Sequence, residues 1–393
     1  MKPKLIKALI MNGSMRPKFN NASDMTFIYR IKQLNFGLLF LISVGCFIGV
    51  AMLYSASNGD MEPWANKHLQ RFLLGLFLAV LIALTDIKVF LKSAYVLYIL
   101  SFILLLAVEL AGHVGMGAQR WIDLYFIKLQ PSELMKVVLI LTLARYFHGR
   151  TFEEIGRPIY LVIPTLIILA PVILVMRQPD LGTAGMILLI GAAIFFLAGV
   201  RLWKFISLLL IGIASIPVAW QFLLEYQKNR ILIFLNPESD PLGAGYHLLQ
   251  SKIALGSGGI FGKGFLNGSQ SHLNFLPEKQ TDFIFTMLAE EFGLVGGLFV
   301  ILLFVIIIGY GYVISFYINN QFGRLVTLGM TTAIFLYVFI NIGMVMGLVP
   351  IVGVPLPFIS YGGTALLATM IAVGFILNGY THRKITLSRF NDE

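Results

Sequence analysis

The sequence predicts an all-α, polytopic integral membrane protein with about ten transmembrane helices. Hydrophobic residues make up 58% of its 393 residues and charged residues only 12%, whereas charged residues make up about 25% of an ordinary soluble domain. The apolar residues also occur in runs of about 20, the length that a helix needs to cross the hydrocarbon core of a bilayer. These features exclude a soluble enzyme.

Ten apolar runs set the expected order of elements. The predicted spans are residues 35–56, 69–86, 91–111, 131–148, 158–176, 182–200, 203–224, 294–316, 325–347 and 363–380. They define one membrane domain at 35–380, between a basic N-terminal segment at 1–34 and a tail at 381–393. The segment 225–282, between spans 7 and 8, is long and polar but keeps enough apolar residues to be ordered. We therefore expect a large external loop with short amphipathic helices that lie on the membrane surface.

The distribution of basic residues predicts the orientation. With ten spans both termini lie on one side, and the segments on that side hold 18 of the 29 Lys and Arg residues although the loops on the other side are longer. Because cytoplasmic segments carry an excess of Lys and Arg, both termini are expected in the cytoplasm. The net charge of +10 is therefore explained by topology, and nucleic acid is not an expected partner.

Cysteine and histidine usage argues against two further classes of site. The single cysteine, Cys46, excludes a disulfide within the chain, and the six histidines show no spacing that is typical of metal ligands. We expect no zinc centre.

The first two polar motifs lie on the predicted outer face. In "GAQRWIDLYFIKLQPSELMK" (117–136), Glu133 and Lys136 are three residues apart and so share one face of a helix that Pro131 begins. They form either a structural ion pair or part of a polar site, because charge at membrane depth is normally paired or faces a cavity. In "RQPDLGTA" (177–184), Arg177 and Asp180 form either a turn with a local salt bridge or part of the same site.

The remaining motifs follow span 7. "GSGGIFGKG" (256–264) fails the P-loop pattern and is interpreted as close-packed turns, although Lys263 could still meet a lipid phosphate. "GLVPIVGVPLPFISYGGTA" (347–365) contains three prolines and four glycines, so a non-helical, re-entrant segment buried in protein is expected.

Asp282 lies where the long loop re-enters the membrane, in "LPEKQTDFIF". It is either a catalytic base or a helix N-cap, with Thr281 as a second candidate for the cap. Glu290 and Glu291, about two turns further along, point in different directions around a helix of 3.6 residues per turn, so we assign them to packing or to partner contacts.

Together these motifs resemble the shape, elongation, division and sporulation (SEDS) family. The resemblance runs from about residue 34 to residue 384, and "GAQRWI" and "GVPLPFISYGGTA" are closer to its rod-shape branch, RodA, than to its division branch, FtsW. It implies a ten-helix peptidoglycan glycosyltransferase of the bacterial inner membrane that polymerises lipid II during cell elongation. It also implies a class B penicillin-binding protein and the elongation machinery as partners.

The resemblance assigns roles to particular residues. The essential acid of the family's external loop falls on Asp282, which would be the catalytic base, and other functional positions fall on Glu133, Lys136 and Asp180. Gln280 stands where many relatives carry histidine, so a mechanism that needs an imidazole there is not expected.

Release of a lipid pyrophosphate needs positive charge. The candidates are Arg120, Lys136 and Lys263, or a divalent cation (Mg or Mn) near Asp282. No other cofactor is expected, because the substrate arrives activated.

Two other functions remain open at this point. A lipid II flippase would need polar residues through the full depth of the membrane, and a non-catalytic scaffold for a penicillin-binding protein would need no acid at Asp282. For the partner, the small residues Gly293, Gly296 and Gly297 are expected to admit its single membrane helix.

Overall fold

The structure, a computed structural model, describes residues 27–388 except for 112, 116–117, 124–127, 223–224, 238–239, 241–243 and 270–277. The predicted basic segment 1–34 is therefore described only from residue 27, and the tail only to residue 388.

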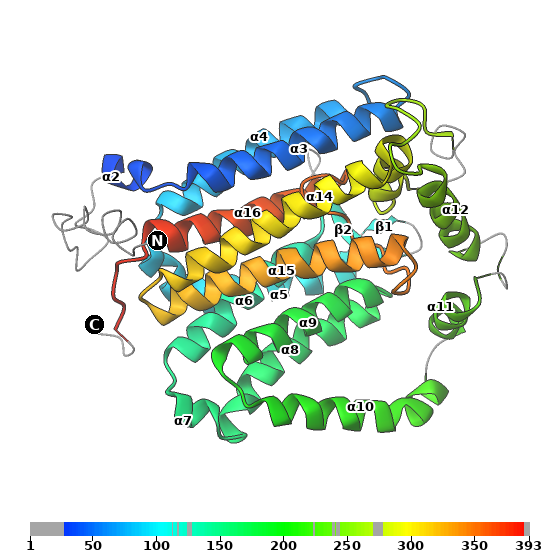
Figure 1. Ribbon diagram of the computed structural model, residues 1–393. Helices are drawn as coiled ribbons and strands as arrows, with labels where there is room; N and C mark the ends of the chain where they lie inside the picture. The colour runs from blue at the N-terminus through cyan, green and yellow to red at the C-terminus, as the bar shows by residue number, and fades with distance from the viewer. Residues whose placement is uncertain are drawn as a thin grey trace, which may run out of the picture.

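The chain folds into a bundle of long helices with a small antiparallel sheet (Figure 1). The long helices are α3 (Phe36–Ala56), α4 (Ala65–Leu84), α5 (Ile87–Ala111), α6 (Pro131–His148), α8 (Ile159–Arg177), α9 (Leu181–Ala198), α10 (Leu202–Phe222), α14 (Ile284–Phe316), α15 (Gln321–Val345) and α16 (Gly363–Thr381). Shorter helices are α2 (Phe27–Lys32), α7 (Phe152–Ile155), α11 (Glu225–Leu235) and α12 (Ala244–Ser257). Strands β1 (His113–Gly115), β2 (Ala118–Asp123) and β3 (Lys128–Leu129) pair in the order β1-β2-β3.

A long helix lies at each predicted span, which confirms the polytopic all-α class. Within the described part of the chain, eight helices are long and apolar enough to cross a membrane. Helix α6 is not among them, because it carries three charged residues, Glu133, Lys136 and Arg145, in its 18 residues. It is instead buried among α5, α9, α15 and α16, so protein covers most of its surface. Helix α10 lies at the edge of the bundle (Figure 1) and exposes most of its apolar side chains.

Both ends of the described chain lie at one end of the bundle. Arg383, after α16, donates from Nη2 to Gln33 Oε1 at 2.7 Å, close to the start of α3. The backbone carbonyl of Arg383 also accepts from the N–H of Asn319, between α14 and α15, at 2.9 Å. Helices α11 and α12 lie towards the opposite end (Figure 1), as expected for a loop on the other side from the termini.

Helix α14 has two parts, and the second part begins at residue 294, where span 8 was predicted to begin. Helix α14 begins at Ile284, and its residues before Gly293 are almost all buried. The helix is broken at Gly293, which has φ 67° and ψ −163°, a conformation that only glycine adopts readily. Glu290 and Glu291, which were expected on a helix after Asp282, lie in the first part of α14, and both side chains are buried by protein.

The motif 256–264 packs against this break, which confirms its interpretation as close-packed turns. The N–H groups of Leu294 and Val295 donate to the carbonyls of Gly259 and Ile260 at 2.9 and 3.1 Å. A Cβ atom at Gly262 would lie 2.1 Å from the carbonyl oxygen of Glu291, so only glycine allows this approach. The loop thereby satisfies backbone groups that the broken helix cannot pair.

The segment between α15 and α16 is non-helical, as predicted, and its second half, residues 354–360, is largely buried. His68 Nε2, from α4, donates to the carbonyl of Phe358 at 3.0 Å. A Cβ atom at Gly49, in α3, would lie 2.8 Å from Ile359 Cα, so α3 also packs closely on this segment. Irregular backbone is tolerated at membrane depth only where protein or a cavity covers it.

Candidate active site

A cavity of about 430 Å³, with several charged and polar residues on its wall, gathers residues from five separate parts of the chain. It is lined by Arg120, Trp121, Lys128, Gln130, Glu133, Asp180, Thr183, Glu278, Thr281, Asp282, Gly353, Pro355, Tyr361, Gly362, Gly363, Thr364 and Ala365. Four of the six predicted site residues lie on its wall, namely Arg120, Glu133, Asp180 and Asp282. Lys136 and Lys263 do not.

The backbone around Asp282 is held by the buried segment before α16 and by α15. Asn341 Nδ2 donates to the carbonyl of Asp282 at 3.0 Å. Ser360 Oγ donates to the carbonyl of Thr281 at 2.6 Å, and the N–H of Tyr361 donates to that of Gln280 at 2.8 Å. The position of Asp282 is therefore fixed through its main chain, and the carboxylate is left for other contacts.

Asp282 is not a helix cap, so that alternative is wrong. The N-cap residue of α14 is Phe283, and no side chain caps the helix. Thr281 does not cap it either, because its hydroxyl donates to the backbone carbonyl of Glu278 at 3.2 Å. Within the described residues, no hydrogen bond or ion pair is made by the Asp282 carboxylate.

The environment of Asp282 favours its protonated form more than water does. Burial, and secondarily the negative charge of Glu278, raise the pKa of Asp282 to about 6. A Cβ atom at Gly353, which has a φ of +71°, would lie 3.3 Å from Asp282 Oδ2. Glycine at this position therefore leaves room beside the carboxylate, which can accept a proton at a pH close to neutral.

Asp180 is a structural acid on the same cavity. Its carboxylate caps α9 by accepting from the N–H of Thr183 at 3.2 Å and from the Thr183 hydroxyl at 2.9 Å. Arg120 Nε lies 3.5 Å from Asp180 Oδ2. A local salt bridge with Arg177 is not formed, because Arg177 pairs with Glu109 at 3.8 Å. Asp180 thus fixes the end of α9 and holds the Arg120 guanidinium at the cavity wall.

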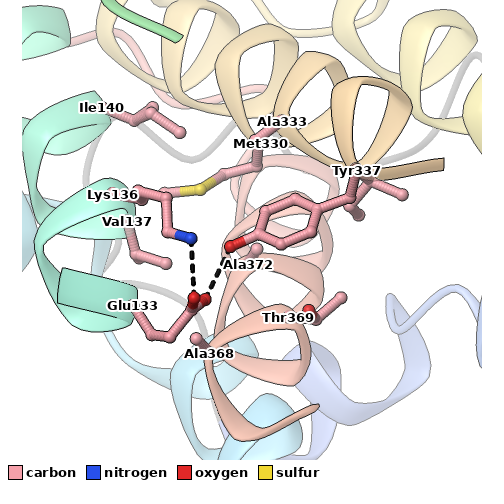
Figure 2. A pocket seen from close by; sticks show the side chains of 11 residues that line it. Glu133, Lys136, Val137, Ile140, Met330, Ala333, Tyr337, Ala368, Thr369 and Ala372 are labelled. Atoms are coloured by element: carbon pink, nitrogen blue, oxygen red, sulfur yellow. Dashed lines mark hydrogen bonds and ion pairs between the residues drawn. The ribbon is translucent and has the colours of Figure 1, made fainter. Parts of the chain in front are cut away.

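Glu133 and Lys136 form a buried ion pair with a third member (Figure 2). Lys136 Nζ lies 2.7 Å from Glu133 Oε1, and the Tyr337 hydroxyl donates to Glu133 Oε2 at 2.6 Å. The same ammonium lies 4.6 Å from the centre of the Tyr337 ring. Glu133 faces both the large cavity and a small one of about 20 Å³, whereas Lys136 lines only the small one. Lys136 therefore acts on the large cavity through Glu133.

Lys263 lies outside this site. Its ammonium is 2.7 Å from Glu290 Oε1 and donates to Ser269 Oγ at 2.7 Å. Glu291 accepts a hydrogen bond from Ser55 Oγ. The packing role predicted for Glu290 and Glu291 is thereby observed, and Lys263 neutralises a buried acid next to the helix break.

Lys128 and Tyr337 are among the contributors to the site that sequence reasoning missed. Lys128 lines the cavity and is exposed, and its place inside motif 117–136 could have identified it. Tyr337 lies in an apolar run of α15, 204 residues from Glu133 in the sequence. No local pattern relates those two positions.

A divalent cation near Asp282 stays a prediction, because Mg²⁺ is usually held by only one or two carboxylates together with substrate phosphates. In the ranges that the structure describes, no group of three or more His, Cys, Asp or Glu side chains is arranged to hold a metal ion. Glu278 is the acid whose charge acts on Asp282. We therefore derive no step of the reaction through a metal.

The fold and the cavity define a helical membrane protein with a polar site at one end, and comparison identifies its family. Residues 30–385 match the family model of the FtsW, RodA and SpoVE cell cycle proteins. The chain belongs to this family, which confirms the predicted SEDS membership.

Individual relatives and structures agree with this assignment. The chain is 43% identical over 340 residues to peptidoglycan glycosyltransferase MrdB of Escherichia coli strain K12, covering 85% of this chain and 90% of that protein. It is 36% identical to stage V sporulation protein E of Bacillus subtilis, covering 84% and 92%.

Two solved structures share the fold. One is a chain of a peptidoglycan synthase complex that coordinates polymerization and crosslinking, with a TM-score of 0.78, 29% identity and coverage of 89% and 98%. The other is the rod shape determining protein RodA of Thermus thermophilus, with a TM-score of 0.68, 27% identity and coverage of 89% and 97%.

Proposed function

We propose that this chain polymerises lipid II into glycan strands during cell elongation, with Asp282 as the catalytic base. Its activity is that of a peptidoglycan glycosyltransferase, the activity for which relatives such as MrdB are named. One observation carries the proposal. A carboxylate that caps no helix and pairs with no described residue faces a cavity with other charged residues on its wall, at one end of a membrane bundle.

The reaction follows from the chemistry of this acid. Asp282 accepts the proton of the acceptor sugar hydroxyl while that oxygen bonds to the anomeric carbon of the lipid-linked donor. The bond from this carbon to the phosphate oxygen breaks, and its electron pair leaves with undecaprenyl pyrophosphate. A carboxylate with a pKa of about 6 is largely ionised at neutral pH, and it is a stronger base than an ordinary aspartate.

Positive charge on the cavity wall offsets the charge that develops on the leaving group. Arg120 is held in place by Asp180, and Lys128 is exposed to the cavity. Glu133 is negatively charged, and Lys136 neutralises this charge while the Tyr337 hydroxyl donates a hydrogen bond to it. Lys136 is thus a positioning residue for Glu133, and we no longer assign a substrate contact to Lys263.

The domain boundaries and the orientation belong to this proposal. A membrane domain at 35–380 carries the site, of which residues 278–282 belong to the external loop 225–282. The protein lies in the bacterial inner membrane with both termini in the cytoplasm, and the cavity faces the outer side. Lipid II suits that position, because its polyprenyl tail stays in the bilayer while its sugars and pyrophosphate lie at the interface.

Cysteine labelling tests the orientation. Asn267 and Thr386 are exposed at opposite ends of the chain's described bundle, and the native Cys46 is buried. A cysteine at Asn267 should react with an impermeant reagent added outside intact cells, and one at Thr386 should not. The opposite result would reverse the topology. Gly353 is unsuitable as a labelling site, because a side chain there crowds Asp282.

A class B penicillin-binding protein is the proposed partner. It is supported by the similarity to a chain of a peptidoglycan synthase complex. The glycines predicted to admit its helix also have structural roles within this chain. Gly293 forms the break in α14, and Gly297 is buried beside Phe285. A Cβ atom at Gly296 would lie 2.2 Å from Phe292 Cβ.

A test of this interface therefore needs other positions on α14. Leu298, Phe299 and Leu302 are apolar and exposed. If the partner's membrane helix packs on this face, replacing them with alanine should reduce co-purification without loss of folding. Full recovery of the complex would place the interface elsewhere.

Polymerisation of lipid II by the purified protein with its partner separates the three candidate functions. A glycosyltransferase makes glycan that depends on Asp282, whereas a flippase or a scaffold makes none. The small cavity beyond Glu133 is lined mainly by apolar side chains such as Val137, Ile140 and Met330 (Figure 2). This lining does not favour a flippase, which needs a polar path through the full depth of the membrane. Glycan synthesis by the Asp282→Asn protein would refute the assigned base.

A further inference from the structure

The N-terminus of α16 faces the cavity with its backbone donors free. The residues from Gly362 to Ala365 all line the cavity. No side chain caps the helix, and its first internal hydrogen bond runs from Leu366 N to Gly362 O at 3.0 Å. In the described part of the chain, no acceptor is found for the N–H groups of Gly363, Thr364 and Ala365. These groups and the helix dipole together favour an anion.

A buried hydroxyl at the same place also lacks a partner. Thr364 is 3% exposed and lines the cavity, and its Oγ1 has no hydrogen-bond partner in the part that the structure describes. A buried hydroxyl without a partner destabilises the fold. Thr364 is therefore explained best by a bound group that accepts its hydrogen bond.

An arginine lies against the start of this helix. The Cζ atom of Arg71, from α4, is 4.8 Å from the centre of the Tyr361 ring. A Cβ atom at Gly363 would lie 3.3 Å from that Cζ, so the absence of a side chain at 363 lets the guanidinium approach the helix end. Arg71 Nη1 is buried and has no hydrogen-bond partner in the described ranges. The Arg71 guanidinium, the Thr364 hydroxyl and three backbone N–H groups therefore all lie at the start of α16.

We propose that Arg71, Thr364 and the α16 N-terminus form a diphosphate subsite that holds the leaving group of the lipid-linked donor. This inference rests on the proposed function, because it takes the donor to be a lipid diphosphate. Thr364 and the start of α16 lie on the same cavity as Asp282, and Arg71 of α4 lies next to two residues of its wall, Tyr361 and Gly363. A diphosphate offers enough acceptor oxygens for all of these donors, and its negative charge grows as the bond to the sugar breaks.

Binding to the full-length Asp282→Asn protein tests the subsite without turnover. Undecaprenyl pyrophosphate in detergent micelles and inorganic pyrophosphate are titrated separately, and tryptophan fluorescence is recorded because Trp121 lines the cavity. A hydrogen bond to a charged group is worth about 1.5–3 kcal/mol, so Thr364→Val and Arg71→Gln should each weaken binding of the lipid pyrophosphate by about 10- to 100-fold. Weaker binding of both ligands by these variants would mean that the diphosphate itself is recognised. Weakening of the lipid ligand alone, without binding of inorganic pyrophosphate, would support the same subsite with a contribution from the tail.

Matched control variants separate this effect from loss of folding. Thr381, at the other end of α16, also has a buried hydroxyl without a described partner. Arg145 lies over the Tyr95 ring at 4.3 Å, much as Arg71 lies over Tyr361. Thr381→Val and Arg145→Gln should bind both ligands like the parent protein.

The outcomes distinguish the subsite from the function. Parental affinity in both Thr364→Val and Arg71→Gln would overturn the subsite, and so would the absence of any binding while wild-type protein still polymerises lipid II. Specific binding by a protein that never makes glycan would instead overturn the proposed function and leave the diphosphate subsite in place.

Discussion

Two aspartates face one cavity and make opposite use of their carboxylates. Asp180 caps α9 through Thr183 and lies 3.5 Å from the guanidinium of Arg120. Asp282 caps nothing, and its main chain rather than its side chain is held by Asn341. An acid with every oxygen occupied stabilises the fold and positions a neighbour. An acid fixed only through its backbone keeps its basicity for a substrate, and this difference separates the structural role of Asp180 from the catalytic role that we propose for Asp282.

The largest effect is expected when aspartate is replaced by asparagine at position 282 and, for comparison, at position 180. Asp282→Asn keeps the shape but removes the base, so polymerisation should fall by about 10²- to 10⁴-fold with little change in melting temperature. Asp180→Asn should retain most activity, because asparagine is as good an N-cap as aspartate. Lipid II polymerisation by both purified variants checks this. Equal losses would show that the two acids have one role.

The second prediction extends the comparison to Glu133, a third acid on the cavity. Removing one member of a buried ion pair is expected to cost about 3–5 kcal/mol, so Lys136→Met should lower thermal stability strongly. Exchanging the two residues keeps a pair but turns a cation towards the cavity and removes the acceptor for the Tyr337 hydroxyl. The exchanged protein should therefore be more stable than Lys136→Met yet inactive.

Thermal unfolding and polymerisation assays on the same preparations measure both effects of the pair. If the exchanged protein polymerises lipid II normally, the pair of Glu133 and Lys136 is only structural. The matched control is the partly exposed pair of Arg150 and Glu154, whose charge atoms lie 3.4 Å apart. Exchange of that pair should leave activity unchanged.

A smaller effect is expected from the cap itself. Asp180→Ala removes the acceptor for Thr183, which should lower the free energy of unfolding by about 1 kcal/mol, whereas Asp180→Asn should not. Arg120 should also lose its fixed position in the alanine variant, which adds a modest loss of activity. Melting temperatures of the two variants compare them directly. Identical melting temperatures would show that the cap contributes nothing measurable.

The smallest effect concerns the pH dependence of Asp282. As a base it must be deprotonated, so activity should fall as the pH drops through about 6. The negative charge of Glu278 helps to raise this pKa, so Glu278→Gln should lower it and move the acidic limb of the pH profile to lower pH. The exposed Glu62→Gln should leave the profile in place. An unmoved limb in Glu278→Gln would mean that another group controls it.

Local features of the chain determined the fold class and part of the site. The apolar runs predict the long helices, because a helix in lipid must be apolar over a fixed length. Helix α6 begins at Pro131 as predicted, and the spacing of Glu133 and Lys136 alone predicts their contact. The family motifs identify Asp282 as the candidate base, but they do not show which of its atoms are free.

Only the tertiary structure decided the remaining roles, because these depend on contacts between residues far apart in the chain. Tyr337 completes the Glu133 pair from α15, and Arg71 reaches the start of α16 from α4. Helix α14 is broken at Gly293, and Lys263 in the loop packed against this break pairs with the buried Glu290 just before it. The same contact takes Lys263 out of the site. A sequence states which charges exist, but their partners, and so their chemistry, are set by packing.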